Sequence, residues 1–426
     1  MKDTSIEKYM EWLKFICLFI GFVCSYLTWV GIDGVSNEMF IYFPKILPAT
    51  ILGMFVLALP KMTTVDKILS AIGLVLVAIP VYFFSDNQAY RNFYWQIPLA
   101  LTFIFLAGKI SYNETFRTIL LYFSGGYVAV MLVKMLMVTF EIGNIVLWTN
   151  QNLIAGPTFF ASMLVVILIE KMDVDYSLIL QGLVSLAAVT VFYLCLSWTP
   201  LISYIAFLAV CLFFKFIPIL RSLVKKKIFW MILFAAMFII IPIFLYLFVV
   251  FEGFGIPLSR REIWEQFFDF WGSDTTYLLT GLRGSFVSTI KNFGTHNAYL
   301  DILGCYGIIG YSLFFGGIYF LTFRHRQKNY SMNQVLCLTA FLFTCLHAMM
   351  ENYLNTTQWV PMIFIYLALF ISQSEEASEL EELELDDEVD EDEDEEDENE
   401  AEESTASNEA AELAETATEE EQPSEV

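Results

Sequence analysis

Four side chains in one short part of the sequence could act on a substrate that carries phosphate. Arg260, Arg261 and Arg283 lie within 24 residues, and His296 follows in the turn-like sequence GTHN at 294–297. Guanidinium groups are always charged, and their planar fork matches the oxygens of a phosphate. They can therefore hold a diphosphate and stabilise the charge that develops as it leaves. An imidazole can accept a proton from an attacking hydroxyl.

Other side chains near these four are candidates for binding a substrate. They are Trp264, Lys291, Asn297, Asp301, His347 and Glu351. Asn297 can instead cap the helix expected after it, and Asp301 can either tune His296 or complement a helix dipole. His347 and Glu351 are expected on one helix face, where they line a site or bond to a neighbouring helix. Because zinc needs a third ligand, we expect no metal. We expect no cofactor either, since no cofactor motif is present.

The segments that must position these residues are long and apolar. Of the 426 residues, 57% are hydrophobic and 16% are charged, whereas a soluble domain has about 25% charged residues. Apolar runs of about 17–23 residues recur along the chain, which is the length of helix that crosses a bilayer. The alternating segments of a membrane barrel are absent. The sequence therefore predicts an all-α, polytopic membrane protein.

Twelve membrane-spanning helices are expected. They cover residues 12–31, 44–60, 67–84, 93–108, 118–139, 153–170, 177–196, 200–217, 229–251, 298–323, 333–351 and 357–372. With the N-terminus in the cytoplasm, 16 of the 23 Lys and Arg residues fall in cytoplasmic segments, as the positive-inside rule requires. The clusters RSLVKKK (221–227) and RHRQK (324–328) are the strongest examples. Both termini are then cytoplasmic, and residues 1–372 form the transmembrane domain.

The longest connection, residues 252–297, then lies on the extracytoplasmic side. Loops of this length are usually functional or disordered, and the many aromatic residues of this one argue against disorder. Its sequence REIWEQFFDFW (261–271) has apolar residues at helical spacing and predicts an amphipathic helix on the membrane face. Three arginines and Lys291 lie here against the positive-inside trend, either by chance or because they bind an anion.

Residues 373–426 differ from the rest of the chain in charge. They hold 28 of the 47 Asp and Glu residues and none of the Lys or Arg, so a small excess of basic residues remains in the first 372. A segment that repels itself and has few aromatic residues cannot bury enough surface to fold. We expect a disordered cytoplasmic tail, which is either a solvated extension or a docking segment for a basic partner.

Four motifs, taken in order, resemble those of the O-antigen ligase and polysaccharide polymerase superfamily. They are RREIW at 260–264, GLRGSF at 281–286, HNAYL at 296–300 and GIIG at 307–310. Their order, spacing and position between the ninth and tenth expected spans all match the family. The chain departs from the family pattern twice. Residues 194–204 lack an arginine that the family often has, and Cys305 stands where an acidic residue is frequent.

The resemblance implies a GT-C-like membrane glycosyltransferase of the bacterial inner membrane that works without a metal. Such enzymes move a glycan from undecaprenyl diphosphate to a hydroxyl of another repeat unit, in polymerases, or of a lipid or other acceptor, in ligases. Arg260 or Arg261 would bind the donor diphosphate, Arg283 would be a second contact, and His296 would activate the acceptor hydroxyl. The implied partners are the lipid-linked donor, the sugar or lipid acceptor, the bilayer and polysaccharide-assembly proteins, but no nucleic acid.

Two other functions stay open at the level of sequence. A transporter, such as a flippase of lipid-linked oligosaccharides, also has about twelve spans, but it usually has ionisable residues near the midplane and repeated halves. Neither feature is visible in this sequence. A sensor that signals through the acidic tail is a third alternative, although no signalling domain is visible. His296 can also be an interfacial histidine with no chemical role.

Overall fold

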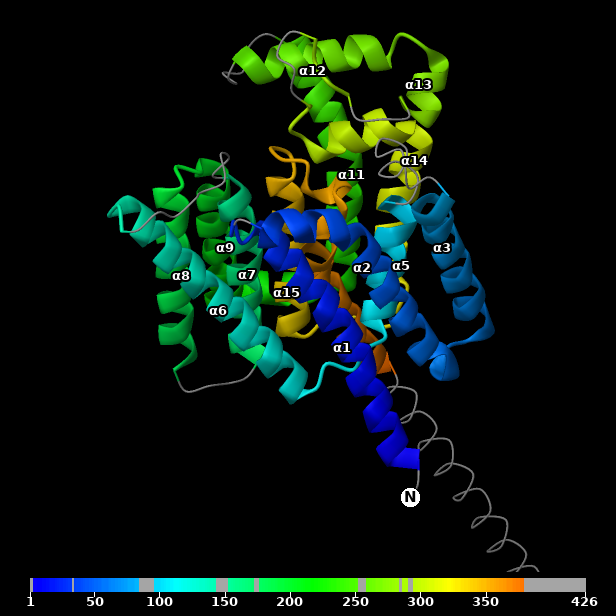
Figure 1. Cartoon of the computed structure of the whole chain (residues 1–426), viewed down its shortest axis with the longest axis vertical. Coiled ribbons are helices and arrows are strands. Elements are labelled where there is room, and N and C mark those ends of the chain that lie inside the picture. Colours follow the sequence, from blue (N-terminus) through cyan, green and yellow to red (C-terminus); the bar gives the residue numbers. More distant parts are fainter. Residues whose placement is uncertain are drawn as a thin grey trace, which may run out of the picture. The chain divides into compact units, whose positions relative to one another are not determined.

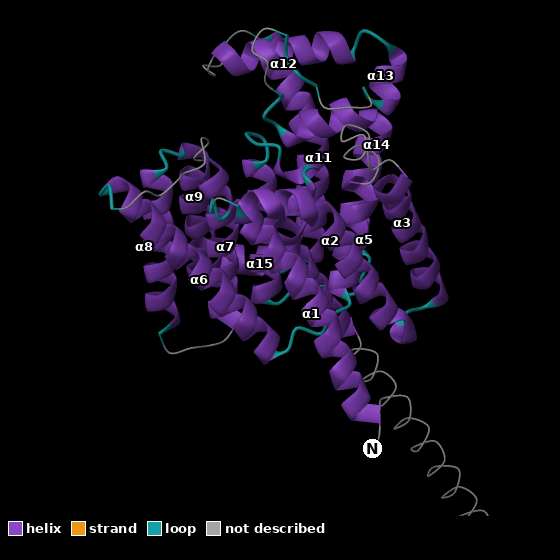
Figure 2. Cartoon of the chain, in the orientation of Figure 1, coloured by secondary structure: helices purple, strands orange, loops and turns teal. Residues whose placement is uncertain are grey.

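Helices and loops make up the described part of the protein (Figures 1 and 2). The structure is a computed structural model that describes residues 3–32, 34–83, 96–142, 152–171, 176–251, 258–282, 286–289 and 294–378. The chain divides into two units, Met1–Ser374 and Glu375–Val426. Only residues 375–378 of the second unit are described, and they are helical. The rest of the expected tail lies outside the described residues.

The first unit is built from long, mostly apolar helices. In chain order they are α1 (Asp3–Trp29), α2 (Val35–Ala58), α3 (Thr64–Phe83), α5 (Gln96–Gly108), α6 (Glu114–Thr139), α7 (Asn152–Lys171), α8 (Ser177–Leu194), α9 (Trp198–Phe216), α10 (Pro218–Val224), α11 (Lys227–Val250), α12 (Leu258–Trp271), α13 (Thr275–Thr280), α14 (Ala298–Phe323) and α15 (Met332–His347). Three short 3-10 turns, Leu59–Lys61, Tyr353–Asn355 and Thr357–Trp359, precede or connect helices, and residues 360–378 form the last described helix.

Eight of the described helices are long and apolar enough to cross a membrane. They are α1, α2, α6, α7, α8, α9, α11 and α14. The protein is therefore an all-α, multi-pass membrane protein. The other four expected spans coincide with α3, α5, α15 and the helix over 360–378. Of these, α5 and α15 have only 13 and 16 residues, so the number of twelve spans stays a prediction.

Side chains expected on the cytoplasmic face meet at one end of the helices. Lys14 of α1 donates through Nζ to the carbonyl oxygen of Lys109, 3.2 Å away. Lys109 and Arg324 each approach the carboxylate of Asp66 to 3.7 Å. Lys14 lies within the first half of α1, and the other three residues come from the ends of α3, α5 and α14. The contacts agree with the expected grouping of these segments on one face, while the side of the membrane is a prediction.

A buried lysine closes the opposite end of α1. Lys134 of α6 is 8% exposed, and its Nζ donates to the carbonyl oxygens of Val30 and Gly31 at 2.8 and 2.7 Å. Carbonyl groups at the end of a helix lack partners within the helix and carry partial negative charge. The ammonium group of Lys134 supplies both the hydrogen bonds and the opposite charge.

The expected amphipathic helix of the long loop is confirmed as α12, which runs across one end of α11 (Figure 1). Its residues Ile263, Trp264 and Phe267 are buried, which places one face against the protein. Asp269 and Phe270 near its C-terminal end are exposed. A helix with one buried and one exposed face lies on the surface of the helical bundle rather than inside it. Its contact with a membrane surface is a prediction.

The expected span 298–323 is present as α14, but α14 is not one continuous helix. It breaks at Gly307, which has φ 64° and ψ −170°. A Cβ at Gly307 would lie 2.4 Å from the carbonyl group of Leu279, and one at Gly281 would lie 2.2 Å from the Cys305 carbonyl oxygen. The last residues of α13 and the glycine that follows it therefore pack their backbone directly into the break. The N–H of Leu282 donates to the Gly304 carbonyl oxygen at 2.7 Å, so the loop satisfies one carbonyl beside the break.

Candidate functional site

His296 lies in a turn whose flanking residues are buried and fixed. Trp264 of α12 donates its indole N–H to the Thr295 carbonyl oxygen at 2.8 Å. Asn297 caps α14, because its Oδ1 accepts hydrogen bonds from the N–H groups of Tyr299 and Leu300. Its Nδ2 donates to the Met349 carbonyl oxygen at 2.8 Å. His296 has φ 47°, a left-handed conformation that histidine adopts more often than most residues. Its side chain is 39% exposed, whereas Thr295 and Asn297 have no exposed surface.

A chain of polar contacts connects His296 to three other segments. Glu351, which follows α15, places Oε2 at 3.8 Å from His296 Nδ1. Its Oε1 accepts from Asn152 Nδ2 of α7 at 3.0 Å, and Asn152 Oδ1 accepts from the hydroxyl of Ser197 at 2.6 Å. Both oxygens of the carboxylate therefore have a neighbour that holds them in place. The distance between His296 Nδ1 and the carboxylate is too long for a hydrogen bond, and the two groups form an ion pair only when the imidazole is protonated. The carboxylate faces Nδ1, so Nε2 lies on the far side of the ring.

Arg260, the first of the two adjacent arginines, contacts the segment that holds Glu351. Its Nη1 donates to the carbonyl oxygen of Met350 at 3.0 Å, next to Glu351 in the chain. Arg261 instead forms an ion pair with Glu265 one turn along α12, with Nε 2.8 Å from the carboxylate. We call Arg260, His296, Glu351, Asn152 and Ser197 the histidine cluster. The sequence leaves the choice between the two arginines open, and it stays a prediction which of them contacts a phosphate.

Asp301 lies in the first part of α14 and is 4% exposed. Asn355 donates Nδ2 to its Oδ2 at 2.7 Å, and the same Nδ2 lies 3.5 Å from the sulfur of Cys305. The other oxygen, Oδ1, has no hydrogen-bond partner among the described residues. The charge of Asp301 acts on His296 electrostatically. Asp301 is therefore a buried carboxyl group of α14 that is close enough to His296 to interact with it electrostatically.

The expectation that His347 and Glu351 share a helix face is wrong. α15 ends at His347, so the chain has already turned before Glu351. His347 is 1% exposed and stacks between the rings of Phe159 and Tyr353, with centroids 4.9 and 5.1 Å away. Neither ring nitrogen has a hydrogen-bond partner among the described residues. His347 is thus part of an aromatic stack, while Glu351 belongs to the histidine cluster.

The remaining site predictions have different outcomes. Asn297 is the helix cap, one of its two expected roles, and Trp264 anchors the turn that presents His296. Arg283 and Lys291, expected to contact an anion, lie outside the described residues. Among the residues that the structure does describe, no group of three or more His, Cys, Asp or Glu side chains is placed to hold a metal ion.

The arrangement is suited to removing a proton beside an anion. An imidazole can accept a proton from a hydroxyl, and a carboxylate beside the ring can stabilise the positive charge that results. Arg260 supplies a permanent positive charge bound to the residue before Glu351. These groups come from α7, α9, α12 and the loops around α14 and α15. Chemistry here would therefore need the folded protein rather than any single segment.

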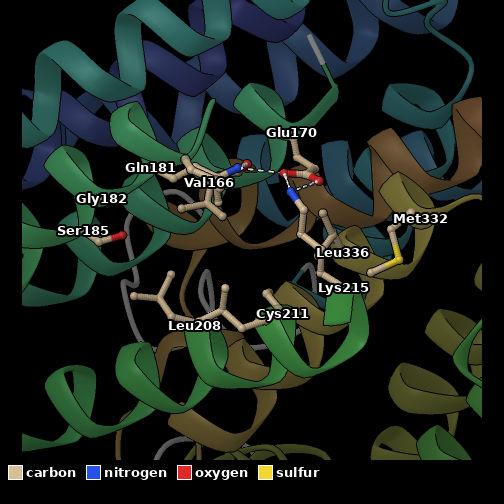
Figure 3. A pocket seen from close by; sticks show the side chains of 12 residues that line it. Val166, Glu170, Gln181, Gly182, Ser185, Leu208, Cys211, Lys215, Met332 and Leu336 are labelled. Carbon is tan, nitrogen blue, oxygen red and sulfur yellow. Dashed lines mark hydrogen bonds and ion pairs between the residues drawn. The ribbon is translucent and has the colours of Figure 1, made fainter. Parts of the chain in front are cut away.

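A cavity of about 210 Å³ lies elsewhere, between α7, α8, α9 and α15 (Figure 3). At one end Glu170 accepts hydrogen bonds from Lys215 Nζ at 2.9 and 3.1 Å and from Gln181 Nε2 at 3.0 Å. Most of its other lining side chains are apolar, and no residue of the histidine cluster lines it. The polar groups at this end bond to one another, so the cavity is a mainly apolar space beside a neutralised ion pair.

The contacts of Asn152 and Ser197 with the site were missed by reasoning from sequence. Asn152 and Ser197 lie 199 and 154 residues before Glu351 in the chain, and neither belongs to a recognisable motif. Their polar character near the ends of apolar segments was the only available signal. The contact between His296 and Glu351 joins positions 55 residues apart and depends on where α15 ends.

No protein-family model matches the chain, and searches of curated proteins and of solved structures found no match either. The likeness to the ligase and polymerase superfamily therefore rests on the four sequence motifs alone.

Proposed function

We propose that this protein is a membrane glycosyltransferase that joins lipid-linked oligosaccharides into a surface polysaccharide, as a polymerase or as a ligase onto another acceptor. The observation that carries the proposal is the convergence of Arg260, His296 and Glu351. They lie on different elements, yet His296 is 3.8 Å from Glu351, and Arg260 bonds to the residue before it. The resemblance to the family implies that the arginine binds the donor diphosphate and that the histidine activates the acceptor hydroxyl.

In the proposed reaction, His296 acts as the general base. An acceptor hydroxyl oxygen attacks the anomeric carbon of the donor sugar and forms the new glycosidic bond. The bond from that carbon to the diphosphate oxygen breaks, and the electron pair leaves with the polyprenyl diphosphate. Nε2 of His296 takes the hydroxyl proton, and Glu351 at Nδ1 stabilises the resulting imidazolium. Attack opposite to the leaving group inverts the anomeric configuration.

Arg260 would bind the diphosphate of the donor. Its hydrogen bonds to Met350 use Nη1, and a guanidinium has five N–H donors. Donors directed at the bridging and terminal oxygens would stabilise the charge that grows as the bond breaks. No step requires a metal ion in this scheme, since the positive charge comes from arginine. Arg283 is proposed as the second phosphate contact.

The departures from the family pattern bear on this site. Residues 194–204 lack an arginine, but Ser197 from this region reaches Glu351 through Asn152. Cys305 replaces an acidic residue, and it lies 3.5 Å from the Asn355 amide that also binds Asp301. We propose that Asp301, one turn earlier on α14, provides the negative charge that the family often places at the position of Cys305.

A transporter of lipid-linked oligosaccharides is the second candidate. The break of α14 at Gly307 favours it, because many transporters bind their substrates at broken helices. In those proteins the break lies near the bilayer midplane, whereas Gly307 is only nine residues after the start of α14. The two functions differ in one observable: a transferase forms a glycosidic bond and releases polyprenyl diphosphate, and a transporter does neither.

The proposal is tested with the full chain reconstituted in vesicles with a polyprenyl-diphosphate oligosaccharide. The measurements are longer glycans on a gel and released polyprenyl diphosphate. We expect His296→Ala to reduce both by about 10²–10⁴-fold, the usual contribution of a general base. His325→Ala is the matched control, because this histidine follows Arg324 at the opposite end of α14, and it should keep wild-type activity. Full activity of His296→Ala would refute the proposed mechanism.

A further inference from the structure

A second cavity, separate from the histidine cluster, is a crevice of about 340 Å³ between α3, α5 and α14. Small residues line its walls, namely Ser70 and Gly73 on α3 and Gly317 on α14. The side chains at its rim include Leu69, Ile72, Leu76 and Phe320, which are each at least half exposed. Because α3 and α5 coincide with two of the expected membrane spans, we expect this surface to face lipid. The crevice would then open sideways toward the acyl chains of the bilayer.

The interior of the crevice has one unsatisfied polar group. Ser70 is 3% exposed, and its hydroxyl has no hydrogen-bond partner among the described residues. A buried hydroxyl without a partner costs free energy, unless something that enters the crevice accepts its hydrogen bond. The volume of the crevice falls within the range of about 300–1,000 Å³ that is typical of pockets for small molecules. It is narrow for a helix, which is about 10 Å across with its side chains.

The crevice has a positively charged end. Arg324 lines it there, with its guanidinium 4.8 Å from the ring centroid of Phe105, another lining residue. Arg324 and Lys109 both lie 3.7 Å from Asp66, so two cations share this carboxylate. Burial lowers the pKa of the neighbouring His325 to about 3, and the positive charges of Arg324, Lys109 and Lys227 add to this effect.

We propose that this crevice is a binding site for an anionic membrane phospholipid. One acyl chain lies between α3, α5 and α14, an ester oxygen accepts from the Ser70 hydroxyl, and the phosphate lies against Arg324. Clusters of basic residues between spans favour anionic headgroups, with about 1 kcal/mol for each Lys or Arg near the membrane surface. The site does not depend on the proposed transferase activity. A bound lipid would hold α3 and α5 together against the part of α14 that follows Gly307.

The test uses the full chain purified in detergent, with bound lipid counted by native mass spectrometry. Dioleoylphosphatidylglycerol is compared with dioleoylphosphatidylcholine of the same chains and with inorganic phosphate as competitor. We expect one phosphatidylglycerol per protein, bound more tightly than phosphatidylcholine and not displaced by phosphate. Arg324→Gln should weaken binding about fivefold, and Ser70→Leu, which fills the crevice while Arg324 remains, should weaken it as well. Arg326→Gln, an exposed arginine two residues away, should bind like the wild type.

Several results would overturn the proposal. Equal binding of the two lipids would remove the role of Arg324, and displacement by inorganic phosphate would show an anion site without an acyl chain. Unchanged binding in Ser70→Leu would place the lipid elsewhere. If Arg324→Gln does not fold, Arg324→Lys and Ser70→Leu decide the question. Arg324→Lys keeps the positive charge, and Ser70→Leu leaves the contact of Arg324 with the headgroup intact. A protein dimer formed in place of lipid binding would assign the crevice to a second copy of the chain.

Discussion

Replacing Gly307 with alanine tests whether the break in α14 is what holds the long loop in place. Gly307 has φ 64° and ψ −170°, a backbone region that is almost restricted to glycine and costs another residue about 1–3 kcal/mol. The added Cβ would also lie 2.4 Å from the carbonyl carbon and oxygen of Leu279. These are backbone atoms, so they cannot rotate away as a side chain could. We expect Gly307→Ala to lower the free energy of unfolding by more than about 3 kcal/mol.

Gly316 on the same helix is the matched control. Among the described residues, a Cβ there would meet no atom of another segment within 4 Å, and alanine is favoured over glycine in a helix by about 1 kcal/mol. Thermal unfolding of both variants in detergent, followed by circular dichroism, gives the comparison. Gly307→Ala should unfold at a clearly lower temperature, and Gly316→Ala at an equal or higher one. The same melting temperature for both variants would refute the break and the packing of the loop into it.

Three further predictions concern the site and its supports. Glu351→Gln should reduce glycan transfer by about fivefold in the vesicle assay, because a partly exposed ion pair such as that with His296 contributes up to about 1 kcal/mol; full activity would remove Glu351 from the site. Asn297→Ala should lower the free energy of unfolding by at least about 1 kcal/mol, because the cap is lost. Asn297→Asp keeps the acceptor but loses the bond to Met349, so its melting temperature should lie between those of Asn297→Ala and the wild type. Equal melting temperatures of all three proteins would contradict the capping role. Lys134→Met should cost about 1.5–3 kcal/mol, since two carbonyl groups at the end of α1 lose a charged donor; an unchanged melting temperature would show that water replaces the lysine.

Several features of the fold could be predicted from local sequence. The spacing of apolar residues in REIWEQFFDFW predicted the helix that forms α12, because the period of a helix is visible within a few turns. The cap at Asn297 was predicted as one of two roles, since asparagine at the start of an apolar run is a local signal. Both features depend on neighbours in the chain, so a single sequence contains the information.

The features that were not predicted depend on contacts between distant segments. The break at Gly307 depends on the backbone of Leu279 and Thr280, which lies beside it. From sequence alone, a glycine in an apolar run is equally well explained by close packing of two helices. Glu351 was expected on a helix face with His347, but α15 ends at His347. The pairing of Glu351 with His296 then follows from the path of the chain after that end. The spacing of residues alone does not contain this path.

Chemical rescue of His296→Ala by imidazole tests the central claim most directly. The variant removes the proposed base and leaves the contacts of Arg260 and Asn297 in place. With the lipid-linked donor in vesicles, we predict that added imidazole restores bond formation and release of polyprenyl diphosphate, and that the restored rate rises with imidazole concentration. A variant that binds the donor but shows no rescue at any imidazole concentration would contradict the role of His296 as the base.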